Sequence, residues 1–305
     1  MIHLSVQTAL VLILHILLLA QHLQPTMLIL QNNLTSANTS IPLLKQCLKL
    51  DQPHVVLLQE IWHPEIELKF HGYSQRPIVL ERKDKKDGAR VLDKKEKKTG
   101  GGVAIITRKD VRCRQIKDLS VPDLEAVWAE VKFKEKKMLV GSVYIPPSDT
   151  CALKVFIKLL SKICGKYNKI VIGMDANSRN PLWDNSTIGR KTGTSYTMGE
   201  HLVDAIQEND MCIHNSGVPT FIQSGNATAP DVTLSKGISV FGNIKWSTSR
   251  RSLGTNHETI FLQIGQERSK STSPCRTYCS KQTHALAYDS CNASVITTRQ
   301  YFPPQ

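Results

Sequence analysis

Residues 169–183, K-I-V-I-G-M-D-A-N-S-R-N-P-L-W, contain the polar side chains that are best placed for chemistry. Three β-branched residues at 170–172 predict a strand buried on both faces, and Asp175 and Asn177 follow it. If the backbone stays extended there, the i, i+2 spacing puts the carboxylate and the amide on one face of the sheet edge. The pair could then hold a hard cation, orient a water molecule or contact a phosphoryl oxygen. The alternative is a turn that closes the strand, because turns favour both residue types.

Polar side chains also stand at the ends of other predicted strands. Each has an ordinary explanation by itself, because a single Glu or His after a strand is more often solvated or structural than catalytic. The repeated position is informative, since sheets of α/β proteins commonly carry their chemistry at strand ends. These residues are Asn33 after strand 27–30, Glu60 after 55–58, Tyr144 within 138–145, Asp231 in 230–234 and His257 before 259–264.

Apolar periodicity predicts the elements that position these side chains. Helical spacing is expected over residues 41–50, where Pro53 ends the helix, and most clearly over 152–163. Residues 127–133 and 138–145 predict a hairpin. The remaining expected elements are strands at 103–107, 211–214 and from 220, a helix at 196–208 and a loop at 235–253.

The composition is that of a globular protein attracted to polyanions. The chain has 305 residues, 41% hydrophobic and 21% charged, which is enough for a sizeable core. The formal net charge of +13 favours nucleic acid over membrane as a partner, although charge identifies no reaction.

The cysteines predict no disulfide framework. Five of them are scattered among apolar segments and are expected to be buried free thiols of a reducing compartment: Cys47, Cys113, Cys151, Cys164 and Cys212. The other three form C-x3-C-x4-H-x6-C with His284, which has the wrong spacings for a zinc knuckle.

Three segments are expected along the chain: residues 1–26, an apolar leader or incidental upstream extension; 27–264, one domain; and 265–305, a polar and disordered tail. The leader has the length of a signal-peptide core, but no Lys or Arg precedes it. A glycosylation sequon begins at Asn33, itself a candidate site residue, which argues against secretion. The lysine-rich run 81–98 is a solvated loop, a phosphate contact or a nuclear import signal. A nuclear or cytoplasmic protein is therefore expected, with secretion as the minority alternative.

Seven motifs contain or accompany the candidate residues in a fixed order: L-I-L-Q-N-N-L, V-V-L-L-Q-E-I-W, G-G-V-A-I-I-T-R, S-V-Y-I-P-P, I-G-M-D-A-N-S-R-N-P-L-W, A-P-D-V-T-L-S and S-L-G-T-N-H. In this order they resemble the endonuclease/exonuclease/phosphatase superfamily, which includes the DNase I-like nucleases. The resemblance is greatest to the endonuclease domain of non-LTR (LINE-type) retrotransposons and covers roughly residues 27–264. The D-A-N…P-L-W and P-D-V-T-L forms favour the retroelement branch.

The resemblance implies an α/β fold, a two-sheet β-sandwich flanked by helices in four DNase I-like layers, with the site at one edge. It implies that Glu60 is the main ligand of a Mg²⁺ ion, with Mn²⁺ as an alternative. Asn33 would assist, and Asn256 would contribute weakly. Hard carboxylate and amide oxygens agree with this assignment, because Mg²⁺ prefers oxygen ligands and keeps several waters.

The resemblance also implies catalytic roles. Asp175 would orient or deprotonate the attacking water, and Asn177 would hold a phosphoryl oxygen. Asp231 would pair with His257 and favour the imidazolium beside the scissile phosphate, to which Tyr144 would donate. In-line attack builds negative charge that a metal and several donors can stabilise without a covalent intermediate.

The sequence departs from the family pattern at Asn256, where relatives carry the Asp of S-D-H. An amide has nearly the same shape but no charge, so it cannot balance a metal ion and an imidazolium. Arg179 and its neighbours also stand where related elements often carry His. No reverse transcriptase follows within the 305 residues, although such a domain normally accompanies this endonuclease.

These features lead to three hypotheses. The first is a Mg²⁺-dependent endonuclease of retrotransposon origin that nicks DNA, leaves 3′-hydroxyl and 5′-phosphate ends and needs no small-molecule cofactor. The second is a nuclease-like domain that binds DNA with little or no cleavage because of Asn256. The third is a secreted DNase or phosphodiesterase. Expected contacts to nucleic acid are Arg179, Trp183, Trp246, Arg250 and Arg251.

Overall fold

The computed structural model describes residues 26–62, 68–80, 101–189, 192–249 and 252–265. The predicted apolar leader, the lysine-rich run, Arg250, Arg251, the cysteines after residue 265 and the tail lie outside these residues. Within the described ranges, no helix has both the length and the apolar character needed to span a bilayer.

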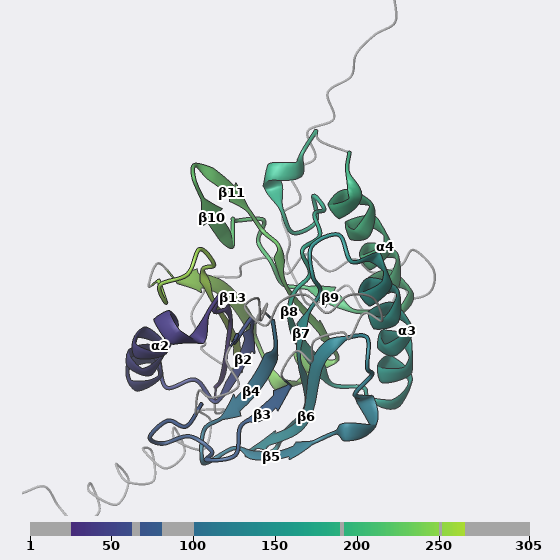
Figure 1. Ribbon diagram of the computed structural model, residues 1–305. Helices are drawn as coiled ribbons and strands as arrows, with labels where there is room; N and C mark the ends of the chain where they lie inside the picture. The colour runs from purple at the N-terminus through teal and green to yellow at the C-terminus, as the bar shows by residue number, and fades with distance from the viewer. Residues whose placement is uncertain (1–25, 63–67, 81–100, 190–191, 250–251, 266–305) are drawn as a thin grey trace, which may run out of the picture.

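Two six-stranded mixed sheets form the body of the protein (Figure 1). The first has the order β13-β14-β1-β2-β4-β3, with β1 Met27–Asn33, β2 Val55–Gln59, β3 Ile78–Leu80, β4 Val103–Thr107, β13 Ile244–Ser249 and β14 Thr259–Ile264. The second has the order β5-β6-β7-β8-β12-β9, with β5 Arg112–Gln115, β6 Glu125–Phe133, β7 Lys136–Tyr144, β8 Ile170–Asp175, β9 Cys212–Ile213 and β12 Asp231–Lys236. A separate hairpin pairs β10 Phe221–Gln223 with β11 Asn226–Thr228.

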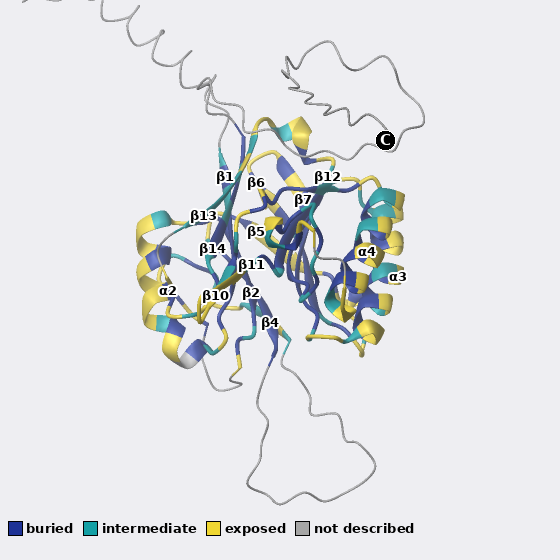
Figure 2. Ribbon diagram, turned by 90° about the horizontal axis from the view of Figure 1, so that it is seen from above, coloured by how far each residue is buried: buried dark blue, intermediate teal, exposed yellow. Residues whose placement is uncertain are grey.

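Helices cover the outer face of each sheet, so the fold has four layers (Figure 2). Helix α2 (Ala37–Asp51) lies on the first sheet, and α3 (Thr150–Lys166) and α4 (Thr194–Glu208) lie on the second. Each interface between layers holds its own apolar cluster. The predicted two-sheet sandwich flanked by helices is confirmed.

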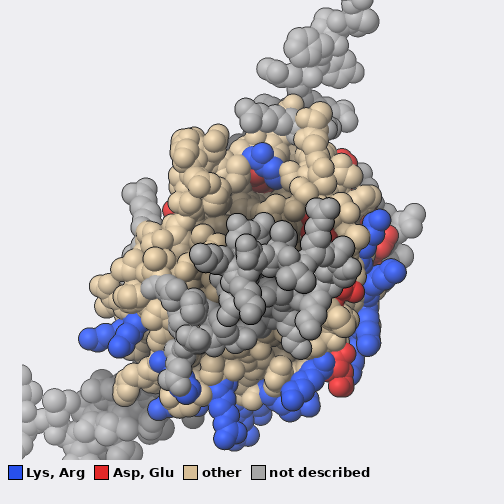
Figure 3. Space-filling model, viewed as in Figure 1, with Lys and Arg blue, Asp and Glu red and all other residues tan. Residues whose placement is uncertain are grey.

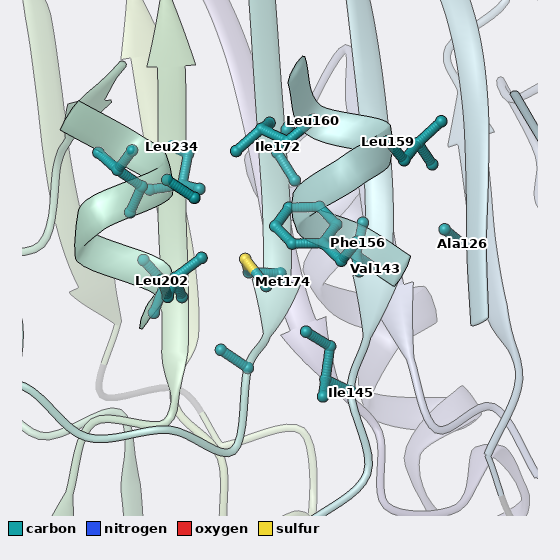
Figure 4. Packing of buried hydrophobic residues seen from close by; sticks show 14 of the residues in the cluster. Ala126, Val143, Ile145, Phe156, Leu159, Leu160, Ile172, Met174, Leu202 and Leu234 are labelled. Carbon is teal, nitrogen blue, oxygen red and sulfur yellow. The ribbon is translucent and has the colours of Figure 1, made fainter. Parts of the chain in front are cut away.

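Helix α3 shows why the outer layer forms. Its buried positions repeat every three or four residues, and Phe156, Leu159 and Leu160 pack on Val143, Ile172 and Met174 of the sheet (Figure 4). Asp149 precedes the helix, and its carboxylate accepts a hydrogen bond of 2.9 Å from the Ala152 amide. The cap and the apolar stripe together fix the helix directly before β8.

The interior between the sheets changes from apolar to polar toward one edge. Along β8, the inward positions are Val171, Gly173 and Asp175, two residues apart. A side chain at Gly173 would lie 2.9 Å from both Gln31 Oε1 and Leu57 Cδ1, so only glycine leaves room for the Gln31 amide. That amide donates to the Met174 carbonyl at 3.1 Å and so links the two sheets beneath the polar edge.

Two sequence-based expectations about local structure were wrong. Residues 235–253 are not one loop: β12 continues to Lys236, and β13 forms an edge strand because each residue of Ile244–Ser249 pairs with β14. The free thiols are also less buried than expected. Cys47 is buried, but Cys113 and Cys151 are exposed, since both lie on the outward faces of peripheral elements.

His54 makes the fold sensitive to acid. It is 8% exposed, its Nδ1 accepts a 3.0 Å hydrogen bond from the Leu28 amide, and burial together with nearby Arg108 lowers its pKa from 6.5 to about 4. The unfolded chain therefore binds this proton more readily, so the contribution of His54 is fully present above pH 6.5 and is lost as the pH falls through 4.

We expect the free energy of unfolding to fall between pH 7 and pH 4.5 by about 1 kcal/mol more in the unmodified protein than in His54→Asn. Asparagine cannot take up the proton but can still accept from the Leu28 amide. Urea unfolding at the two pH values measures the difference. Equal losses in the two proteins would exclude this residue as the cause.

Candidate active site

Strand register brings the polar strand ends to one edge of the sandwich. β1 and β2 run parallel, as do β7 and β8, so their carboxyl ends point the same way. Asp175 is in register with Tyr144 on one side and with Asp231, the first residue of antiparallel β12, on the other. The inward pleat of these strands then directs the side chains into the space between the sheets.

Asp175 is the centre of the site. It is 1% exposed, and its Oδ2 accepts a 2.7 Å hydrogen bond from Asn33 Nδ2, 142 residues away on the opposite sheet. Its Oδ1 accepts from the Asn177 amide at 3.1 Å. Burial, then the charge of Asp231, raises its pKa from 3.8 to about 7, although His257 and the two hydrogen bonds act in the other direction. The carboxyl is therefore poised to exchange a proton near neutral pH.

Asp231 and His257 form a buried ion pair beside it. His257 Nδ1 lies 2.9 Å from Asp231 Oδ2, so Nδ1 carries the hydrogen and donates to the carboxylate. Burial by itself lowers the pKa of His257, but the charge and hydrogen bond of Asp231 outweigh it, with help from Asp175 and Glu60, and raise that pKa to about 9. The imidazole is thus a cation at neutral pH.

Thr220 forms a hydrogen bond to this ion pair. It was not predicted as a site residue from the sequence. Its fully buried hydroxyl donates to Asp231 Oδ2 at 2.7 Å. The next residue, Phe221, packs its ring edge-on against the His257 imidazole with centroids 4.8 Å apart. The only sequence signal was the start of a predicted strand, because the partner carboxylate lies eleven residues further along the chain.

Two candidate residues adopt the left-handed backbone region. Glu60, directly after β2, has a φ of 48°, and Asn177, two residues after β8, has a φ of 43°. The extended backbone expected through Asn177 is therefore wrong, and its Nδ2 donates to the Ile145 carbonyl at 3.0 Å. Positive φ in a non-glycine residue costs energy and is concentrated at functional sites.

Tyr144 and Asn256 lie at the site in different ways. The Tyr144 side chain is buried with the apolar cluster between the sheets, in register with Asp175. Asn256 is exposed and precedes His257; its carbonyl accepts from the Ile222 amide at 2.8 Å. Within the described ranges, no hydrogen bond joins the Asn256 amide side chain to the other candidate residues.

The predicted nucleic-acid contacts need correction. Trp183 is fully buried in the core under α3 and α4, and its indole donates to the Ser178 carbonyl, so it cannot present its ring to DNA. Trp246 packs against the inter-sheet cluster, and its indole donates to Thr233 Oγ1 at 3.0 Å. Arg179 remains one-third exposed but pairs with Asp184 at 3.3 Å. The core encloses the Trp183 ring, and the Trp246 indole is partly buried against the inter-sheet cluster, so both serve packing.

The residues present fit a hard divalent cation. Ligand atoms of Asp175, Asp231 and His257 lie within 4.8 Å of one another, and Asp231 Oδ1 is buried without a hydrogen-bond partner among the described residues. The site holds the carboxylates of Glu60, Asp175 and Asp231 against one imidazolium. Burial first, and then the charge of Asp231, raises the pKa of Asp175, so a bound cation would favour its carboxylate form. Carboxylate and amide oxygens in a partly desolvated, acidic site are the donor set that Mg²⁺ takes.

This fold is that of known nucleases. The endonuclease domain of TRAS1, a telomere-specific non-LTR retrotransposon, superposes with a TM-score of 0.60 and 19% identity over 79% of this chain and 99% of that one. The AP endonuclease LMAP from Leishmania major superposes with a TM-score of 0.59 and 10% identity over 79% and 88% of the two chains. An AP endonuclease from Archaeoglobus fulgidus gives 0.53 and 16% over 77% and 98%.

Comparison of the sequence with protein families gives a more specific similarity than the fold does. Residues 138–261 match the family described as endonuclease-reverse transcriptase, a stretch that contains Tyr144, Asp175, Asp231 and His257. Curated proteins give no significant match. The resemblance to the endonuclease/exonuclease/phosphatase superfamily, and within it to retrotransposon endonucleases, is confirmed.

Proposed function

We propose that the protein is a metal-dependent endonuclease of retrotransposon origin that hydrolyses one phosphodiester of duplex DNA. The observation that carries the proposal is a buried carboxyl with a raised pKa beside a buried imidazolium. Asp175 has its pKa raised to about 7, and Asp231 holds a cationic His257 at 2.9 Å. Groups whose pKa values are separated in this way suit base and acid roles in one reaction.

Each of these side chains has a separate role in an in-line displacement at phosphorus. The Asp175 carboxylate orients the attacking water and takes its proton, which a pKa near 7 permits at physiological pH. The His257 imidazolium, held by Asp231, stabilises charge on the phosphate, and the Tyr144 hydroxyl and Asn177 amide add donors. Thr220 positions Asp231 through its hydroxyl.

Mg²⁺, or Mn²⁺ in its place, would be held by Glu60 with help from Asn33. When bound, it supplies Lewis-acid stabilisation of the phosphoryl and leaving-group oxygens. Asn33 has a second task that needs no metal, because its Nδ2 donates to Asp175 and fixes the direction of that carboxylate. Asn256 contributes little on this proposal, since its amide is exposed and uncharged.

Nicking of supercoiled plasmid by the full chain tests the proposal. We expect Mg²⁺-dependent conversion to the open circle, its loss with EDTA, and at least about a 100-fold lower rate in Glu60→Gln. The matched control is Glu135→Gln, an exposed glutamate in the β6–β7 turn, which should leave the rate unchanged. Nicking that survives in Glu60→Gln would point to a contaminant or another site.

A second candidate function is DNA binding with little cleavage, because a neutral, exposed amide precedes His257 where relatives carry an acid. It predicts salt-sensitive binding without turnover, and recovery of nicking in Asn256→Asp. If the unmodified chain already nicks as fast as that variant, this candidate fails.

We place the protein in the nucleus or cytoplasm, where DNA or a retroelement intermediate is accessible. The Asn33 sequon supports this against secretion, because the side chain is 1% exposed and hydrogen-bonded to Asp175, so a glycan there is incompatible with the fold. Fractionation of cells expressing the full chain would test this placement. Glycosidase-sensitive protein in the medium would contradict it.

A further inference from the structure

Helix α3 carries an unusual distribution of charge on its solvent side. Lys154, Lys158, Lys162 and Lys166 follow one another at four-residue spacing, and all four are exposed. The helix contains no Asp or Glu at all. Like charges at i, i+4 destabilise a helix, whereas an ordinary solvated face alternates signs and gains from the pairs. The arrangement is therefore costly unless a polyanion neutralises it.

The basic face extends beyond the helix. At its far end, Lys166 shares a cleft of about 450 Å³ with Lys117 and Arg114, which also contains Asp118 and Glu130, the latter 3.4 Å from Arg114. Lys and Arg atoms gather along the right and lower margins of the molecule, where Figure 1 places α3 and β5, while the upper part of this face is mostly uncharged (Figure 3). We define the α3 lysine face as Lys154, Lys158, Lys162, Lys166 and Lys117.

The lysines on this face have few internal partners. Among the described residues, no ion pair involves Lys154, Lys158 or Lys162, although α4 beside them carries exposed Glu200 and Asp204. Ser161, which receives the hydrogen bond from Asn209 at the end of α4, lies on the Lys154 side of the stripe, and each later lysine turns about 40° further around α3, away from that contact. The positive charge thus faces solvent.

The spacing fits a phosphodiester backbone. Four residues of α-helix advance about 6 Å and turn about 40° beyond a full circle, so the four lysines of α3 span about 18 Å along a row that winds by about 120°. Along one strand of duplex DNA the phosphates advance about 3.4 Å each, so each lysine step matches about two phosphates. Long, flexible lysine side chains on this winding row can therefore reach successive phosphates of a strand that curves around its own duplex axis.

The face is separate from the catalytic edge. Helix α3 starts soon after Tyr144 at that edge and ends before β8 starts at the other, so the row leads from the site along the outside of the second sheet. DNA cut at the edge contacts the residues around Asp175, whereas the lysine row meets a duplex segment beyond them.

We propose that the α3 lysine face is a second docking surface for duplex DNA, which holds the flanking duplex while the catalytic edge engages the scissile phosphate. This inference rests on the proposed function, since it takes DNA as the polyanion. The proposed surface affects the affinity for DNA and its dependence on duplex length, and it takes no part in the chemical step.

Fluorescence anisotropy of the full chain with a labelled 30-base-pair duplex, without divalent ions, tests the docking surface. Replacing the four α3 lysines by glutamine should weaken binding at least about tenfold at 0.1 M salt and reduce the slope of log K against log salt by about 3 to 4. Glutamine keeps the helix propensity of lysine, so the fold should be unaffected. An unchanged slope would overturn the proposal.

A matched pair of double variants separates position from net charge. Lys154→Gln with Lys158→Gln removes two charges from α3, and Lys45→Gln with Lys49→Gln removes two at the same spacing from α2 on the other outer layer. We expect the first pair to weaken binding several-fold more than the second. Equal losses of affinity in the two double variants would show that only the overall charge matters, and would overturn the proposal of a specific DNA-binding face.

Two further measurements exclude other occupants and separate this inference from the proposed function. Sedimentation should show the same oligomeric state before and after the substitutions; a dimer that dissociates would reassign the face to a second copy. Stronger, lysine-dependent binding of single-stranded RNA of equal length would also overturn the assignment. The variant with the four substitutions should still nick a 12-base-pair duplex. If the unmodified chain does not nick this duplex, the proposed function is contradicted instead.

Discussion

Replacing Asp175 by asparagine should lower the single-turnover nicking rate by about 1,000-fold, the largest effect we expect from any single substitution. The carboxylate is the group with a pKa near neutrality at the centre of the site, and an amide cannot accept a proton from water. The shape is retained and Asn33 can still donate to the remaining oxygen, but the new NH₂ group then faces the Asn177 backbone N–H, which loses its acceptor. Comparing the unfolding of the variant with that of the unmodified protein separates a loss of chemistry from a loss of folding.

The folding consequences of the same substitution have a defined sign. Asp175 has a folded-state pKa of about 7, above the value of 3.8 in an unfolded chain, so the unfolded state releases this proton first. In metal-free protein the group consequently costs stability as the pH rises from about 4 to 7, and the asparagine variant lacks that loss. Urea unfolding without divalent ions at pH 5 and pH 8 would measure it.

The control for this prediction is Asp118→Asn, an exposed carboxylate-to-amide change remote from the site. It should alter neither the nicking rate nor the pH dependence of unfolding. If Asp175→Asn retained more than a tenth of the unmodified rate, another group would have to activate the water, and the assignment of the base would be abandoned.

The second large effect concerns Asp231 and His257, which we expect to act as one unit. Asp231→Asn and His257→Gln should each lower nicking at pH 7.5 by about 100-fold or more, and the double variant should be no worse than His257→Gln alone. The reason is that the main proposed contribution of Asp231 to the reaction is to hold the imidazolium, through the 2.9 Å hydrogen bond. Losses that multiply in the double variant would show that Asp231 contributes independently.

The pH dependence distinguishes this explanation from a structural one. Asp231 is the main reason that the pKa of His257 is about 9, because burial alone lowers it. Without that acid the imidazole loses its proton more readily, so the deficit of the variant relative to the unmodified enzyme should shrink as the pH is lowered, although protonation of Asp175 slows both. Titration of the His257 ring by NMR in metal-free protein should show the pKa fall by more than 2 units.

The same ion pair contributes to stability with a pH dependence of the same sign as that of Asp175, but at higher pH. The folded pKa of His257, about 9, lies above the unfolded value of 6.5. Its contribution is therefore fully present below pH 6.5 and is lost as the pH rises through 9. In Asp231→Asn this decline should disappear from the alkaline side of the stability curve.

Local sequence patterns were enough to identify the polar side chains at strand ends and their order along the chain. Runs such as 170–172 and 55–58 are apolar on both faces because a helix covers one side and the second sheet the other, so their identity as strands was readable locally. The α3 helix was equally clear, since its apolar spacing matches its buried face. These patterns identified the principal acids at strand ends, whereas the two-sheet fold class was predicted from the family resemblance.

The role of each polar residue depends on hydrogen bonds and burial that involve segments far away in the sequence. The bond from Asn33 to Asp175 crosses 142 positions, and the Thr220 hydroxyl reaches Asp231 through a hairpin, so neither follows from local pattern. Trp183 illustrates the converse: its neighbours indicated a surface loop, but α3 and α4 enclose it. Burial and charge from distant segments set the pKa values, because desolvation depends on everything packed around a group and not on its neighbours in sequence.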